Sequence, residues 1–80
     1  MTQAEKHQEY IEELADDQIL PELKQRPGDK LTITAIKKIT GTVASDNSVI
    51  EALEYLEAGG EVISFEPTPN TPKKWAVPGR

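Results

Sequence analysis

The stretch DNSVIEALEYLEAGG, residues 46–60, decides the fold prediction because it carries the clearest helical pattern in the chain. At 100° per residue its larger apolar side chains fall on one face, as in a helix packed on one side. Ser45 or Asp46 can cap the first turn, and Gly59-Gly60 ends the helix with residues that accept left-handed geometry. The pattern therefore predicts an amphipathic helix over 46–58. Its core-facing residues are Val49, Ala52, Leu53 and Leu56.

The segment after this helix is typical of a β-hairpin. Residues 61–66 and 73–77 are both rich in β-prone side chains, and the six residues between them, PTPNTP, cannot form regular structure. We expect Trp75 to pack on the core and the proline-rich tip to be stiff and exposed.

A shorter helix is predicted before residue 46. Thr32 or Thr34 can cap a helix that runs to about Thr40, and Gly41 then stops it. Residues 31–33, Leu-Thr-Ile, are β-prone and predict a short strand in front of this helix.

The N-terminal part of the chain is also helical in character. Residues 3–18 are strong helix formers, and Pro21 either begins a second helix or bends one long helix. Pro27-Gly28 fits the two central positions of a type II turn, so the first helical region ends near Gln25.

A narrow stripe on the first helix admits two interpretations. Ala4, His7, Ile11 and Leu14 recur at helical spacing. The stripe either packs on its own domain or forms a short seam between two copies, which would make a homodimer through residues 3–20. His7 lacks further ligands at a fixed spacing, so we interpret it as a packing or surface histidine rather than a metal ligand.

The composition describes one small acidic domain. The chain has 80 residues, with 14 Asp and Glu against 9 Lys and Arg, a formal charge of −5 and no cysteine. Disulfide frameworks and cysteine-based zinc sites are therefore excluded. The sequence contains neither an apolar run of about 20 residues nor a signal-peptide pattern, so we expect a soluble, cytoplasmic protein that does not contact membranes.

The chemistry-bearing motifs do not indicate an enzyme. The carboxylate pairs Glu12-Glu13 and Asp16-Asp17 lie on a highly charged helix and are expected to be solvated. Gly59-Gly60 is not followed by the lysine of a phosphate-binding loop. We therefore expect a non-enzymatic protein without metal or cofactor.

Taken in order, three segments resemble a winged helix-turn-helix domain. LTITAIKKITG resembles the first strand and first helix of the helix-turn-helix unit, TVASDNSVIEALEYLEAGG its turn and recognition helix, and EVISFEPTPNTPKKWAV the wing. The resemblance covers residues 15–78. It implies an α+β fold with a three-helix core and a C-terminal β-hairpin wing over residues 15–80, preceded by an N-terminal helical extension over residues 1–14.

The resemblance also implies a function, namely duplex DNA binding by a transcriptional or DNA-transaction regulator. The third helix of such domains enters the major groove, and the wing contacts the backbone or minor groove. Carried over by position, the residues that would read bases are Asp46, Asn47, Ser48, Ile50 and Glu51. Those that would contact phosphates are Lys37, Lys38, Thr42, Lys73 and Lys74, and the polar contacts of the wing tip would be Asn70 and Thr71.

The charge of the predicted third helix keeps two other functions open. Residues 46–58 contain no Lys or Arg, and Asn47, Glu51 and Glu54 are predicted to point outward. Arginine and lysine are the side chains that most often pair with guanine and phosphate. The chain could instead be a winged-helix protein–protein interaction module, or an acidic inhibitor that occupies the site of a nucleic-acid enzyme.

Overall fold

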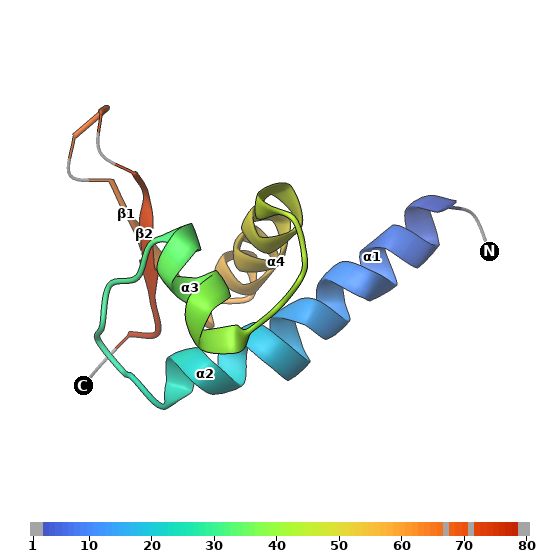
Figure 1. Ribbon diagram of the computed structural model, residues 1–80, viewed down its shortest axis with the longest axis horizontal. Coiled ribbons are helices and arrows are strands. Elements are labelled where there is room, and N and C mark those ends of the chain that lie inside the picture. The colour runs from blue at the N-terminus through green and yellow to red at the C-terminus, as the bar shows by residue number, and fades with distance from the viewer. Residues whose placement is uncertain (1–2, 67, 71, 79–80) are drawn as a thin grey trace.

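The computed structural model describes residues 3–66, 68–70 and 72–78, which form an α+β domain (Figure 1). In the described chain, one long N-terminal helix and two shorter helices pack with a two-stranded antiparallel sheet. This confirms the predicted fold class at the level of α+β.

The long helix is continuous across Pro21. It consists of α1 (Gln3–Glu13), a π-helical segment η1 (Leu14–Ile19) and α2 (Leu20–Lys24), and the residues at both junctions have right-handed helical dihedral angles. The Leu20 N–H donates to the Ala15 carbonyl, five residues back. In a regular α-helix the proline ring would clash with the carbonyl four residues earlier, and the wider π-turn relieves this clash. The alternative in which a second helix begins at Pro21 is therefore wrong.

Side-chain caps set the starts of the two shorter helices. α3 (Ile33–Thr40) begins after Thr32, whose Oγ1 accepts from the Ala35 N–H at 3.2 Å. α4 (Asp46–Ala58) begins after Ser45, whose Oγ accepts from the Ser48 N–H at 3.2 Å. Gly41 ends α3 in the left-handed region at φ 67°. The predicted span of α4 and the glycine stop of α3 are both confirmed.

The sheet is shorter than the sequence predicts. β1 (Ile63–Phe65) pairs with β2 (Lys74–Ala76), with Ser64 opposite Trp75. The prediction of a strand over residues 31–33 is wrong, because only Leu31 pairs with the sheet. It forms an isolated bridge with Trp75 through hydrogen bonds of 2.9 and 2.8 Å. The capping role of Thr32 turns the chain into α3 immediately after that bridge.

The turn after the long helix is tied to the chain that follows β2. The Asp29 N–H donates to the Arg26 carbonyl at 3.1 Å, and Gly28 has φ 84°, which confirms the type II turn at Pro27-Gly28. The Gly28 N–H also donates to the Val77 carbonyl at 3.0 Å. The turn is thereby fixed to the chain that leaves β2.

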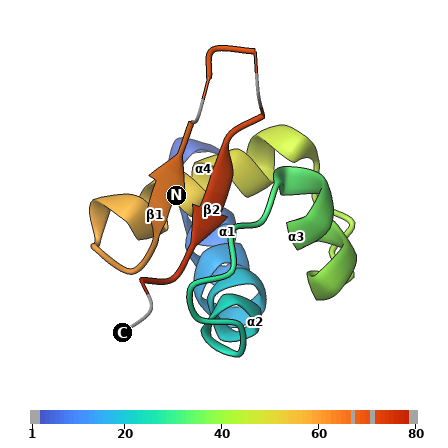
Figure 2. The ribbon, with the colours of Figure 1, turned by 90° about the vertical axis from the view of Figure 1, so that its left-hand side faces the viewer.

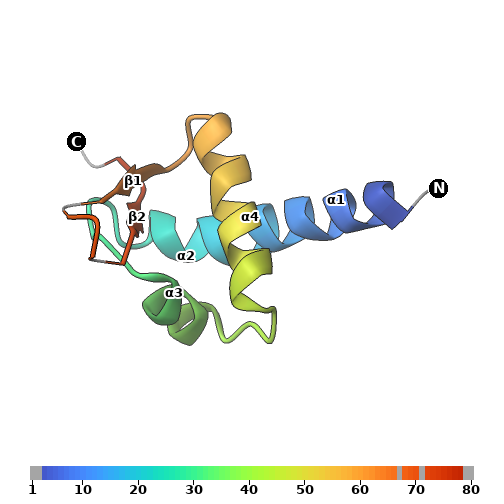
Figure 3. The same cartoon turned by 90° about the horizontal axis from the view of Figure 1, so that it is seen from above.

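The core lies where α4 crosses the long helix (Figure 3). Trp75 is 1% exposed and closes this core from the side of the sheet, as predicted. Ile11 and Leu14 are buried in the same core, so these two members of the N-terminal stripe pack on their own domain. The buried positions of α4 are Val49, Ala52, Leu53 and Leu56.

Candidate nucleic-acid interface

The outward face of α4 is polar and acidic. Asn47, Glu51 and Glu54 are exposed, as the helical pattern predicts, and α4 carries no basic side chain. The hairpin of β1 and β2 lies at the α2 end of the long helix, opposite the N-terminus, and its tip points away from that helix (Figures 1 and 2). Because α4 and the hairpin line a common groove, a partner approaching α4 would also meet the hairpin.

Two of the acidic side chains on α4 are held by basic groups from other helices. Lys37 Nζ on α3 lies 2.8 Å from Asp46 Oδ1, and His7 Nε2 on α1 lies 2.6 Å from Glu51 Oε2. Both contacts are at the surface, so solvent and salt screen them. They nevertheless place a basic group beside each acid, and they leave Lys37 engaged rather than available to a phosphate.

The predicted lysines of the hairpin differ in exposure. Lys73 is exposed, and its Nζ lies 5.2 Å from the centroid of the Trp75 ring. Lys74 is half-buried on β2, where it pairs in register with Phe65. Lys30, which the sequence does not single out, places its Nζ 4.4 Å from the Phe65 ring centroid. Lys30 and Lys74 line one surface of the hairpin beside Phe65, whereas Lys73 lines a different surface beside Trp75.

Several other predicted contact residues are used to build local structure. The Thr42 Oγ1 accepts from the Ala44 N–H at 3.2 Å in the turn between α3 and α4. Ser48 belongs to the cap of α4, where its Oγ lies 3.1 Å from Ser45 Oγ. Lys38 and Asn70 are exposed, on α3 and at the hairpin tip. Thr71 lies outside the described residues.

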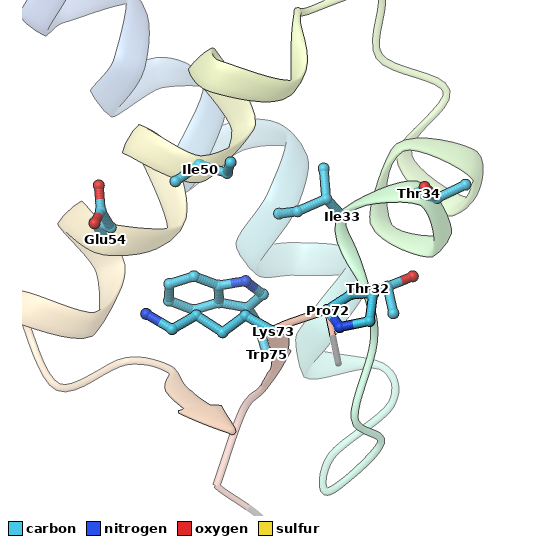
Figure 4. A pocket seen from close by; sticks show the side chains of 8 residues that line it. All are labelled: Thr32, Ile33, Thr34, Ile50, Glu54, Pro72, Lys73 and Trp75. Atoms are coloured by element: carbon cyan, nitrogen blue, oxygen red, sulfur yellow. The ribbon is translucent and has the colours of Figure 1, made fainter. Parts of the chain in front are cut away.

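A groove brings α4 and the hairpin together (Figure 4). It has a volume of about 310 Å³ and is bounded by Ile33 at the start of α3, Ile50 and Glu54 on α4, and Pro72, Lys73 and Trp75 from the hairpin. Ile50 and Lys73, both predicted contact residues, therefore lie on one surface. The structure also leaves the buried Trp75 Nε1 without a hydrogen-bond partner among the described residues.

Neither a cluster of metal ligands nor a helix that could span a membrane occurs among the described residues. Across residues 3–66, 68–70 and 72–78, no group of three or more His, Asp or Glu is placed to hold a metal ion. In the same part of the chain, no helix is both long and apolar enough to cross a bilayer.

The pKa of the Tyr55 phenol is raised by three causes: the carboxylate of Asp16, which is the largest, then burial of the phenol, and then the carboxylate of Glu12.

No family model matches the chain, and no curated protein or solved structure is significantly similar to it. The candidate site therefore stands on its own geometry.

Proposed function

We propose that this chain is a winged helix-turn-helix domain that binds duplex DNA, with α4 toward the major groove and the β1–β2 hairpin as the wing. The element order supports the proposal: α3, a short turn at Gly41, α4 and then a hairpin, with Leu31 bridged to β2. In this arrangement a helix and a wing can contact the same duplex.

The observation that carries the proposal is the shared surface of α4 and the hairpin. Ile50 and Glu54 of α4 line the same groove as Lys73 of the hairpin. A duplex lying against α4 would therefore pass Lys73, whose charge would meet a phosphate.

The Lys37–Asp46 ion pair reduces the electrostatic cost of placing α4 against DNA. An acidic side chain facing a phosphate through water costs about 1 kcal/mol, and salt lowers this value further. The Lys37 ammonium lies 2.8 Å from Asp46 Oδ1 and offsets its charge, whereas the His7 contact with Glu51 is a hydrogen bond that offsets charge only when the imidazole is protonated. Among the described residues, Glu54 and Glu57 are the exposed carboxylates of α4 without an ion pair, and Glu57 accepts a hydrogen bond from the Ser64 hydroxyl.

The salt dependence of DNA binding tests the proposal. The available phosphate contacts are Lys38, Lys73 and Lys74, because Lys37 is held by Asp46. Three contacts predict that log K falls against log salt with a slope of about −2.7. The double variant Lys73→Gln/Lys74→Gln should bind more weakly, with a slope of about −0.9.

The matched control is Lys6→Gln/Lys24→Gln, which removes the same number of charges from exposed positions of the long helix. It should leave the slope close to that of the unmodified protein. Equal slopes for the double variant and the unmodified protein, with both folded, would remove the hairpin from the interface and contradict the proposal.

A second function, protein–protein interaction by the same winged-helix fold, is favoured by one specific observation. The outward face of α4 has no basic residue, and the groove beside it is largely apolar. A protein partner would bind through this groove and the glutamates of α4. Partner binding that is unchanged in Lys74→Gln, whose side chain does not line the groove, with no binding to duplex DNA, would support this second function.

A further inference from the structure

The groove between α4 and the hairpin has the character of a small-molecule site. Its walls are the aliphatic side chains of Ile33 and Ile50, with Pro72 at one end and the Trp75 indole as its floor (Figure 4). Its volume of about 310 Å³ is at the lower end of the range for ligand pockets. A compact aliphatic group would fit between the two isoleucines.

The floor of the groove offers an unused hydrogen-bond donor. Trp75 is 1% exposed, and its Nε1 has no hydrogen-bond partner in the described part of the chain. Figure 4 shows this nitrogen on the edge of the indole that faces the space between Ile33 and Ile50. Indole nitrogen only donates, and a buried donor without an acceptor lowers stability. A ligand that brings an acceptor into the groove would satisfy it.

Two charged side chains at the rim decide which acceptor is favoured. Lys73 extends along the indole with its Nζ 5.2 Å from the ring centroid, and Glu54 of α4 lies at the same end of the groove as this ammonium (Figure 4). The indole N–H donates to any acceptor, Lys73 favours an acceptor that is anionic, and Glu54 disfavours one. Because a carboxylate would satisfy the indole donor and also attract the Lys73 ammonium, we take the ligand to carry a carboxylate.

We propose that this groove binds a small carboxylic acid with a compact aliphatic body. The aliphatic body packs between Ile33 and Ile50, and the carboxylate accepts from the Trp75 Nε1–H once one of these side chains rotates aside. Lys73 strengthens binding and Glu54 weakens it. The proposal goes beyond DNA binding and does not depend on it, since the site lies within a single chain.

Trp75 provides the readout, because it is the only tryptophan of the protein. The probe is cyclohexanecarboxylate, added to the full chain in the absence of DNA. Its neutral and cationic counterparts with the same ring are cyclohexanecarboxamide and cyclohexylamine. We expect the carboxylate to shift the indole N–H resonance and the Trp75 emission saturably, the amide to bind more weakly, and the amine not to bind.

Two variants with opposite expected signs test the site. Lys73→Gln should weaken carboxylate binding about fivefold and Glu54→Gln should strengthen it about fivefold, as expected for charges acting through solvent. Both side chains are exposed, so the fold should survive, and circular dichroism checks this. Lys24→Gln, on α2, should leave the affinity unchanged.

Three results would overturn the proposal. The first is no saturable change of the indole N–H resonance at millimolar carboxylate. The second is equal binding of the amine and the carboxylate, and the third is an affinity that Glu54→Gln does not raise. The third result remains decisive even where Lys73→Gln disturbs the hairpin. None of these results bears on DNA binding, which is measured without the ligand.

Discussion

Gly41 and Gly59 end neighbouring helices, and the structure predicts opposite effects of alanine at the two positions. Gly41 has φ 67°, in the left-handed region, whereas Gly59 has φ −84° and ψ 0°. A Cβ at Gly41 meets nothing within 4 Å, and a Cβ at Gly59 meets only two carbonyl oxygens at 3.7 Å, an ordinary contact. Side-chain packing therefore does not distinguish the two substitutions, and the backbone conformation decides whether alanine raises or lowers the free energy of unfolding.

The magnitudes follow from the backbone. Left-handed geometry costs an L-residue roughly 1–2 kcal/mol, while replacing glycine stabilises a compatible site by about 0.4–1 kcal/mol through the unfolded chain. Gly41→Ala should therefore destabilise the domain by about 1 kcal/mol net, and Gly59→Ala should stabilise it by about 0.5 kcal/mol. For a domain of this size, 1 kcal/mol corresponds to a Tm change of about 4–8 °C.

The assay is thermal and urea unfolding of both variants beside the unmodified protein. We expect the Tm of Gly41→Ala to fall and that of Gly59→Ala to rise, with unchanged denaturant m-values. The two variants shifting Tm in the same direction would refute the reasoning. Such a result would mean that the turn between α3 and α4 does not have the left-handed geometry that sets the placement of α4.

Three further predictions concern the core, a cap and a titration. Leu53→Ala, at a position that is 0% exposed, should lower the free energy of unfolding by about 2–5 kcal/mol in urea titrations; a loss below 1 kcal/mol would contradict its burial. Ser45→Ala removes the cap of α4 and should cost about 1 kcal/mol in the same assay, whereas an unchanged midpoint would mean that the cap contributes nothing. Asp16→Asn should lower the pKa of Tyr55, followed by NMR titration of its ring, because the Asp16 carboxylate is the largest cause of its elevation above 10.0. The raised pKa keeps the Tyr55 phenol neutral in the folded protein at a pH where the phenol of the unfolded chain has ionised, so the free energy of unfolding should fall as the pH rises above 10. A Tyr55 pKa that does not change in Asp16→Asn would show that the Asp16 carboxylate does not raise it.

The elements that local patterns specify could be predicted from the sequence. α4 was predictable to the residue because its apolar period, its serine cap and its terminal glycines all agree. The burial of Trp75 and the type II turn at Pro27-Gly28 follow from equally local features. Such features act within a few residues, and tertiary packing does not override them here.

The strand at residues 31–33 and the helix at Pro21 could not be predicted with the same reliability. Thr32 has both β propensity and a capping hydroxyl, and the cap prevails in the structure because it satisfies the Ala35 N–H. At Pro21 the sequence leaves two outcomes open, since a π-turn and a helix break both avoid the ring clash. Packing of Ile19 and Leu20 into the core favours continuity of the helix.

The candidate site depends more on contacts between distant residues. His7 and Glu51 are 44 positions apart, and no local pattern brings them together. The Lys37–Asp46 pair spans only nine residues, and it was accessible from the short turn between two predicted helices. The groove and its unpartnered indole nitrogen required the packing of α3, α4 and the hairpin, so the sequence alone could not reveal them.

The most direct test of DNA binding by the surface shared by α4 and the hairpin is retention of a pool of duplex genomic fragments by the folded protein. Retention is measured at several salt concentrations, and the bound fragments are sequenced. We expect enrichment of a common site, with retention that falls as salt rises. Absence of retention at low salt from a folded sample would contradict DNA binding and leave the glutamate-lined face of α4 as a surface for a protein partner.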